Sequence, residues 1–267
     1  MDDDEVGASW GLRLLSGVIA VWLLAPIAIV IPLSFTDRSS FQFPPKEWSL
    51  RFYRNLFTDD AWRGALLTSI SLATVVALIS ITIGTLAAFA LFKSNRRWIA
   101  VLEGLLFAPM ILPSVVLAVA LFSFYLRWHL VGTFVGFVIA HTVLAVPFSI
   151  ITVRAGLQSL NPSLERAAAS LGATPLVGFF LVTLPVLLPS IFAGMAFSFM
   201  VSFDEVVVAL FIQSPDMQTL PVKMWTSIAT GTDPTIAAAA TMTFVLSVLI
   251  ILIWQYKPGR KRGASAL

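Results

Sequence analysis

Three absences narrow the chemistry that this 267-residue chain can perform. It contains no cysteine, which excludes a disulfide framework and a thiolate metal site. Its only histidines, His129 and His141, are not accompanied by a close carboxylate cluster, so a metal site is not expected. The phosphate-loop pattern G-x-x-x-x-G-K-[ST] and the patterns G-x-S-x-G and H-E-x-x-H are also missing. We therefore expect no catalytic residue, metal or cofactor in this chain.

Charge is scarce as well. Charged residues make up 12% of the sequence, whereas hydrophobic residues make up 58% and the mean hydropathy is +0.91. Soluble domains usually contain about 25% charged residues, so this chain is expected in a lipid bilayer. The net charge of +3 indicates no particular partner, and nothing in the sequence indicates nucleic-acid binding.

Long apolar stretches predict the fold class. A hydrocarbon core about 30 Å thick needs about 20 apolar residues of helix to cross it. The fifth stretch is the least regular, because Pro185 and Pro189 obscure its start and Asp204 and Glu205 interrupt its second half. We predict one all-α integral membrane domain, 1–267, with six transmembrane helices. These are expected at residues 14–35, 65–92, 104–126, 130–153, 186–211 and 234–256.

The first stretch is expected to remain in the protein as a membrane span. It is too long for the apolar region of a signal peptide, acidic residues 2–5 precede it, and no small-x-small site follows. Lys and Arg favour an orientation with both termini in the cytoplasm, because cytoplasmic loops carry an excess of basic residues. The basic residues then placed inside are Arg13, Lys93, Arg96, Arg97, Arg154, Arg166, Lys257, Arg260, Lys261 and Arg262.

Some local features predict structure rather than chemistry. Residues 51–57, RFYRNLF, predict a short interfacial helix. The small-xxx-small spacing of Gly84 and Ala88 predicts close helix packing. Pro109 and Pro113 predict a kink in the third stretch, which either eases packing or marks a gate.

The region 157–185 contains a short capped helix between two apolar stretches. Asn161 is a good N-cap, and Pro162 suits the first helical position. Gly172 fits the left-handed position that ends a helix, and Pro175 blocks its continuation. Residues spaced i, i+3, i+4 and i+7 share one helix face, which here would suit a groove on another protein. This face consists of Leu164, Ala167, Ala168 and Leu171.

Three ionisable residues are candidates for a transport pathway. His141 lies inside the fourth stretch, where a hydrogen bond to a neighbouring helix is favoured over a direct role. Asp204 and Glu205 lie about 27 Å of helix beyond the start of the fifth stretch, in the outer half of the membrane or at its outer face. They either attract a cationic solute at the mouth of a pathway or form an interfacial pair that ends a helix.

The capped region resembles the EAA loop of ABC-importer permeases, whose pattern runs E-A-A, Gly, then I/L-x-L-P. Arg166 stands where the family usually has Glu, and Glu165 lies one residue earlier. The resemblance implies that this loop is a cytoplasmic coupling helix that docks on an ATPase, but it leaves open which residue makes the polar contact. The residues assigned to this docking are Leu164, Glu165, Arg166, Ala167, Ala168, Leu171, Gly172 and Ala173.

Further segments resemble permeases of the spermidine/putrescine type. They are the F-x-F-P-P segment, the S-F-D-E-V-V-V run around residue 204, the T-L-P-V-K-x-W run at 219–225, and the P-x-x-x-A-x-A-T lead-in at 234–241. With the EAA loop, the resemblance covers nearly the whole chain. Permeases for opines, phosphonates and other small cations share much of this pattern, so these solutes remain alternatives.

The resemblance implies a type I ABC importer permease in a bacterial inner membrane. Its partners would be a second homologous permease, two cytoplasmic ATPase subunits that bind ATP and Mg, and an extracytoplasmic solute-binding protein. Two other classes compete with this interpretation. A membrane-embedded enzyme would need a cluster of ionisable groups at one depth. An ion-driven secondary transporter usually shows an inverted repeat, interrupted helices and coupling carboxylates near mid-membrane.

Overall fold

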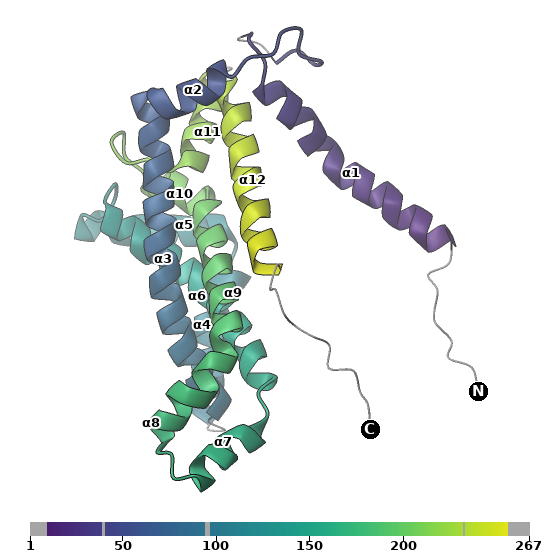
Figure 1. Ribbon diagram of the computed structural model, residues 1–267. Coiled ribbons are helices and arrows are strands. Elements are labelled where there is room, and N and C mark those ends of the chain that lie inside the picture. The colour runs from purple at the N-terminus through teal and green to yellow at the C-terminus, as the bar shows by residue number, and fades with distance from the viewer. Residues whose placement is uncertain (1–9, 39–40, 94–96, 232, 256–267) are drawn as a thin grey trace. The chain divides into compact units, whose positions relative to one another are not determined.

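A computed structural model of the chain describes residues 10–38, 41–93, 97–231 and 233–255 (Figure 1). Residues 2–5, most of the basic turn at 93–97 and the basic tail from Lys257 therefore lie outside the described residues. The helices are α1 (Trp10–Ser34), α2 (Arg51–Thr58), α3 (Asp60–Lys93), α4 (Arg97–Ile111), α5 (Ser114–Trp128), α6 (Phe134–Gln158), α7 (Pro162–Ser170), α8 (Pro175–Gly178), the π-helical turn η1 (Phe179–Thr183), α9 (Leu184–Phe203), α10 (Val207–Ile212), α11 (Leu220–Thr230) and α12 (Thr235–Gln255).

Length and apolar composition make five of these helical stretches suitable for crossing a membrane. The bent pair α4 and α5 adds a sixth if it counts as one span, within the residues that the structure describes. The five are 10–34, 60–92, 134–158, 175–203 and 235–253. The chain is thus an all-helical, multi-pass membrane protein. Its contacts divide it into two compact units, residues 1–63 with 224–249, and residues 64–223 with 250–267.

The first unit contains α1, α2 and most of α12. In α1 only Ser34 is buried, so this apolar helix packs against little else within its own unit. The helix expected at residues 51–57 is confirmed as α2, which buries Phe52 and Leu56 on one face. Asn55 on α2 donates a hydrogen bond to the hydroxyl of Thr235 at the start of α12 (2.9 Å), which ties these two elements together.

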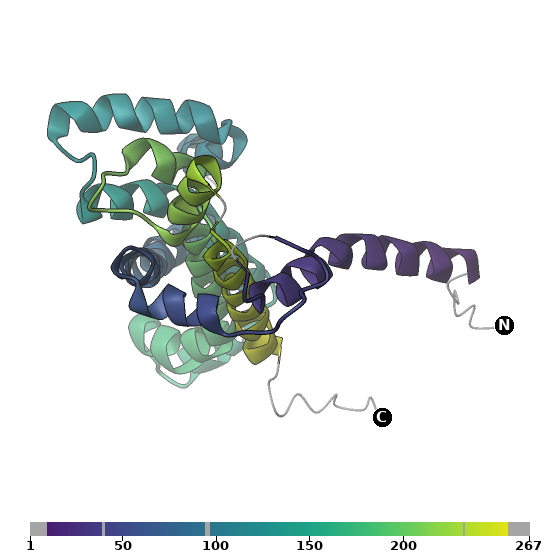
Figure 2. The same cartoon turned by 90° about the horizontal axis from the view of Figure 1, so that it is seen from above.

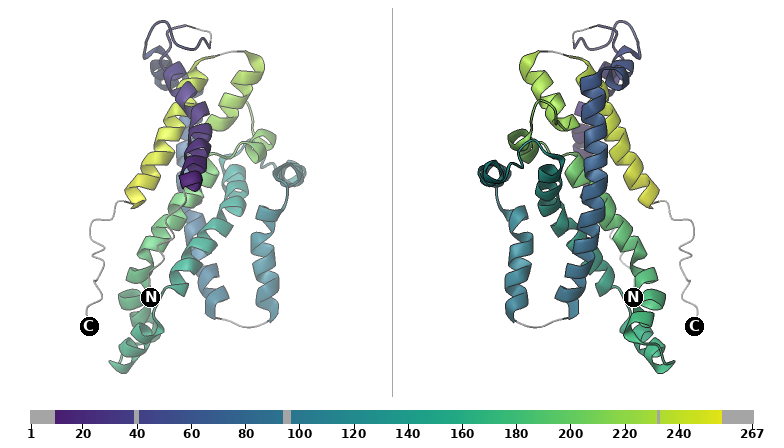
Figure 3. Two further views of the ribbon diagram at one scale, coloured as in Figure 1. Left: turned by 90° about the vertical axis from the view of Figure 1, so that its right-hand side faces the viewer. Right: turned by 90° about the vertical axis from the view of Figure 1, so that its left-hand side faces the viewer.

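The third expected span, 104–126, is wrong as a continuous helix. Helix α4 ends at Ile111, and α5 begins at Ser114 with its axis turned by 104°. Figure 3 shows α5 end-on while α4 stands upright. The prolines interrupt this span as expected, but the result is a break rather than a kink. Pro113 lies at the break because it has no N–H and disfavours helical geometry at the preceding Leu112.

The fifth expected span, 186–211, is wrong at both ends. A continuous helical stretch of 29 residues runs through α8, η1 and α9 from Pro175 to Phe203. The π turn η1 ends at Thr183, two residues before Pro185, which has no N–H to bond a carbonyl in η1. Residues 204–206 are not helical, and α10 is a separate short helix. The loop expected at 157–185 accordingly ends near Thr174.

The second unit is built around α6, which packs against α9 and α4. The close packing expected at Gly84 is confirmed, because a Cβ there would lie 2.4 Å from the Cβ of Ser149 on α6. A Cβ at Gly156 would likewise lie 2.3 Å from the Oγ of Ser190 on α9. Helix α5 packs beside α10 (Figure 2). The buried core of this unit consists of two clusters, one with Leu72, Val76, Tyr125 and Phe137 and the other with Ile150, Val153 and Leu187.

Candidate functional site

The capped helix expected at residues 161–172 is confirmed as α7, at one end of the second unit (Figure 1). The Asn161 side chain accepts a hydrogen bond from the Ser163 N–H (3.0 Å), and Pro162 occupies the first turn. Gly172 has φ +87°, the left-handed geometry that an L side chain rarely adopts. The N–H groups of Gly172 and Ala173 bond the carbonyls of Ala169 and Ala168, both at 3.0 Å, completing a Schellman motif. Both ends of α7 are therefore fixed by local sequence.

Helix α7 is joined to the following span by one side-chain hydrogen bond. The hydroxyl of Thr183 in η1 donates to the carboxylate of Glu165 (2.9 Å), and Glu165 is half-buried. Between α7 and α8 lies a hollow of about 270 Å³. The hollow is lined by Glu165, Ala168, Ala169, Ala173, Thr174, Pro175, Gly178 and Phe179. Glu165 is among the residues expected to dock on an ATPase, whereas Thr183 was not expected at this site, because its contact depends on the fold of η1.

The outer side of α7 is the side that faces away from the rest of the chain. It is not the apolar face that the residue spacing predicts. Ala168 lines the hollow and so belongs to the inner side. At about 100° per residue, Ser163, Ala167 and Ser170 fall opposite the hollow. All three are exposed, as are Leu164 (44%) and Leu171 (89%) on one flank. Arg166 lies on the other flank and is exposed. The outer side of α7 is thus a ridge of small residues between an apolar flank and a cationic one.

His141 is buried between α6 and α9. Its Nδ1 lies 3.0 Å from the Oγ and 3.2 Å from the carbonyl oxygen of Ser202. A second pair, Ser149 and Ser198, joins the same two helices through their hydroxyls (2.7 Å). Hydrogen bonding to a neighbouring helix, the favoured interpretation of His141, is therefore confirmed, and a role in the pathway stays a prediction.

Asp204 and Glu205 lie at the break between α9 and α10. The Asp204 backbone caps α9 by donating to the carbonyl of Met200 (3.0 Å), while its side chain is exposed. The carboxylate of Glu205 accepts a hydrogen bond from the Val208 N–H (2.8 Å) at the start of α10. Ending α9 and starting α10 is thus one role of this pair, and the attraction of a cationic solute by these carboxylates stays a prediction.

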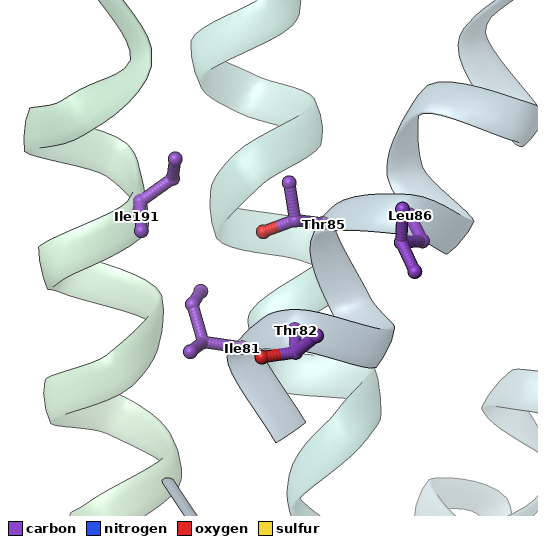
Figure 4. A pocket seen from close by; sticks show the side chains of 5 residues that line it. All are labelled: Ile81, Thr82, Thr85, Leu86 and Ile191. Carbon is purple, nitrogen blue, oxygen red and sulfur yellow. The ribbon is translucent and has the colours of Figure 1, made fainter. Parts of the chain in front are cut away.

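Two further features of the second unit are structural. Glu103 on α4 forms an ion pair with Arg154 on α6, which holds these helices together. An apolar hollow of about 250 Å³ is lined by Thr82, Thr85 and Leu86 of α3, with Ile81 and Ile191 pointing toward one another from α3 and α9 (Figure 4). The Thr82 hydroxyl donates to the carbonyl of Leu78 (2.8 Å), so this hollow suits packing rather than a polar ligand.

Comparison with known proteins shows the family. Residues 80–260 match the family model described as binding-protein-dependent transport system inner membrane component. The chain is 30% identical over 241 residues to the spermidine/putrescine transport system permease protein PotC of Haemophilus influenzae, covering 89% of this chain and 92% of that protein. It is 31% identical over 228 residues to the putrescine transport system permease protein PotI of Escherichia coli, covering 83% of this chain and 81% of that protein.

Solved structures show the same fold. The chain superposes on a bacterial ABC transporter involved in the import of the acidic polysaccharide alginate with a TM-score of 0.68, at 15% identity, covering 97% of this chain and 100% of that one. For the MetNI methionine ABC transporter the TM-score is 0.59, at 16% identity, covering 74% and 96%. The fold is therefore that of ABC importer permeases. The family match makes the chain a transport subunit rather than an enzyme. This chain belongs to the family of binding-protein-dependent transport system inner membrane components.

Proposed function

We propose that this permease imports polyamines such as spermidine or putrescine. The observation that supports the solute is the identity of 30–31% to relatives named as spermidine/putrescine or putrescine permeases, over 81–93% of their length. The exposed Asp204 carboxylate at the α9–α10 break agrees with a cationic solute, because a carboxylate at a pathway mouth raises the local concentration of cations. His141 and Glu205 are the other candidates for a role in this pathway.

The proposed assembly contains two permeases and their partners. This chain pairs with a second homologous permease in the bacterial inner membrane, with both termini in the cytoplasm. Two ABC ATPase subunits bind ATP and Mg on the cytoplasmic side, and a solute-binding protein delivers the solute from outside. Opines, phosphonates and other small organic cations are the alternative solutes for the same assembly.

In this proposal α7 is the mechanical link to the ATPase. ATP binding closes the ATPase pair, and α7 moves with the subunit on which it docks. The fixed ends of α7 and the hydrogen bond from Thr183 to Glu165 carry that movement into η1 and α9. A rigid connection matters here, because a loose one would absorb the displacement without switching the pathway between its inward- and outward-facing states.

Co-purification tests this function. The tagged chain is solubilised gently from its native membrane, and the proteins that accompany it are identified by mass spectrometry. We expect a homologous permease and an ABC ATPase. The solute-binding protein encoded with them is then titrated with spermidine and putrescine by calorimetry. A chain that purifies alone contradicts the assembly, whereas a binding protein that ignores polyamines contradicts only the solute.

A further inference from the structure

We infer that Arg166 on α7 contacts a carboxylate of the ATPase subunit, so that this permease presents the cation and its partner the anion. The inference rests on the proposed docking of α7 and adds the chemistry of the partner surface. The partner groove would have an apolar wall facing Leu164 and Leu171, and an acidic wall facing Arg166. Between these walls it would approach closely over Ser163, Ala167 and Ser170.

The structure separates the two charged side chains of α7. Glu165 is half-buried and accepts the hydrogen bond from Thr183, so its carboxylate is occupied within the chain. Arg166 is exposed, and no described residue provides its guanidinium with a hydrogen bond or an ion pair. Adjacent residues of a helix diverge by about 100°, so the bond that turns Glu165 toward η1 turns Arg166 away from it. The only charge that α7 offers to a docking partner is therefore positive.

The chemistry of arginine then specifies what must face it. A guanidinium stays protonated in proteins and carries five N–H donors in a fork that fits a carboxylate with two parallel bonds. Docking removes water from the flank of α7, and a charge that loses water without gaining a partner is strongly unfavourable. An acidic residue on the ATPase satisfies both the charge and the donors. A basic residue at that position would repel Arg166 and weaken docking.

A substitution series at Arg166 tests the sign of the partner charge. The tagged chain and its co-expressed ATPase are solubilised together, and the fraction of ATPase retained is measured across a range of salt concentrations. We expect Arg166→Lys to retain ATPase nearly as well as the native chain. The fraction of ATPase retained should fall about tenfold in Arg166→Gln, because the attraction is lost. It should fall about a hundredfold in Arg166→Glu, because the reversed charge adds repulsion. Salt should weaken the native complex but not that of Arg166→Gln.

Two controls separate this inference from the docking proposal. Lys46→Glu makes the same charge reversal at an exposed residue outside α7 and should leave retention unchanged. Leu164→Asp changes the apolar flank and should release the ATPase. If Leu164→Asp releases the ATPase while Arg166→Glu binds as well as or better than the native chain, docking stands and the acidic partner is wrong. If neither releases it, the docking proposal itself fails.

Charge exchange identifies the partner residue. In the Arg166→Glu background, each exposed Asp and Glu of the co-purified ATPase is replaced in turn by Arg. One such replacement should restore retention to within about threefold of the native complex, and should weaken the native chain when introduced alone. If no replacement restores it, Arg166 does not pair with a carboxylate of this subunit. Intact chain yield and a single gel-filtration peak in detergent show that each permease variant is folded.

Discussion

Glu165 and Arg166 are neighbours in sequence with opposite surroundings. The Thr183 hydrogen bond turns one inward, and the helix geometry turns the other outward. Spacing alone could not assign these roles, because Thr183 lies 18 residues from Glu165 and reaches it only through the turn between α7 and η1. The caps at Asn161 and Gly172, by contrast, depend on adjacent backbone groups and were predictable from sequence.

Removing the Thr183 hydroxyl should reduce the efficiency of coupling without releasing the ATPase. Thr183→Val keeps the shape of the side chain but leaves the half-buried Glu165 carboxylate without its donor, at a cost of about 1–3 kcal/mol. The ratio of solute transported to ATP hydrolysed is the measurement, and it should fall severalfold. Glu165→Gln is the matched control, since its amide oxygen still accepts the bond. An unchanged ratio in Thr183→Val would show that the bond transmits no movement.

Gly172→Ala should loosen the end of α7. The site has open space but φ +87°, so the substitution tests backbone strain alone, about 1 kcal/mol. The amides of residues 168–173 should exchange their hydrogens about fivefold faster, as measured by hydrogen-exchange mass spectrometry under native conditions. Gly178→Ala is the control, because Gly178 also has open space but lies at φ −58°. Equal exchange in the two variants would contradict the role of the left-handed turn.

Among whole elements, α6 has the most constrained packing, because small residues on α3 and α9 allow close approach to it. The apolar stretches were predictable from hydropathy, and an interruption of the third stretch was predictable from Pro109 and Pro113. The size of the 104° turn and the π turn before Pro185 were not predictable, since they depend on which neighbours accommodate the missing N–H groups. The start of the fifth helical stretch at Pro175 was missed because proline tolerates the first turn of a helix and so opens α8.

Gly84→Ala should destabilise the contact between α3 and α6. The added Cβ would lie 2.4 Å from the Cβ of Ser149 and 3.2 Å from the N of Ile150, so the helices must separate. Overpacking of this kind costs about 1–3 kcal/mol and should lower the thermal midpoint in detergent by several degrees. Gly104→Ala on α4 meets nothing within 4 Å and serves as the control. A midpoint equal in both variants would show that α3 and α6 are not in close contact.

At the scale of the whole molecule, the extensive exposed apolar surface and the uncovered outer side of α7 both indicate partners. Lipid covers much of the exposed apolar surface, and in the proposed assembly a second permease covers another part of that surface. In the proposed assembly, an ATPase subunit covers the outer side of α7. Membership of the family was predictable from the EAA-like loop, whereas the solute was not, because related permeases share the same segments.

The most direct test of the central claim is ATP-driven uptake by the purified complex in proteoliposomes, with the loaded solute-binding protein outside and ATP inside. We predict that labelled spermidine enters only when ATP is present, and that Leu164→Asp abolishes this uptake although the variant chain inserts normally. Uptake driven by an ion gradient in the absence of ATP, and unaffected by Leu164→Asp, would contradict the account and identify the chain as a secondary transporter.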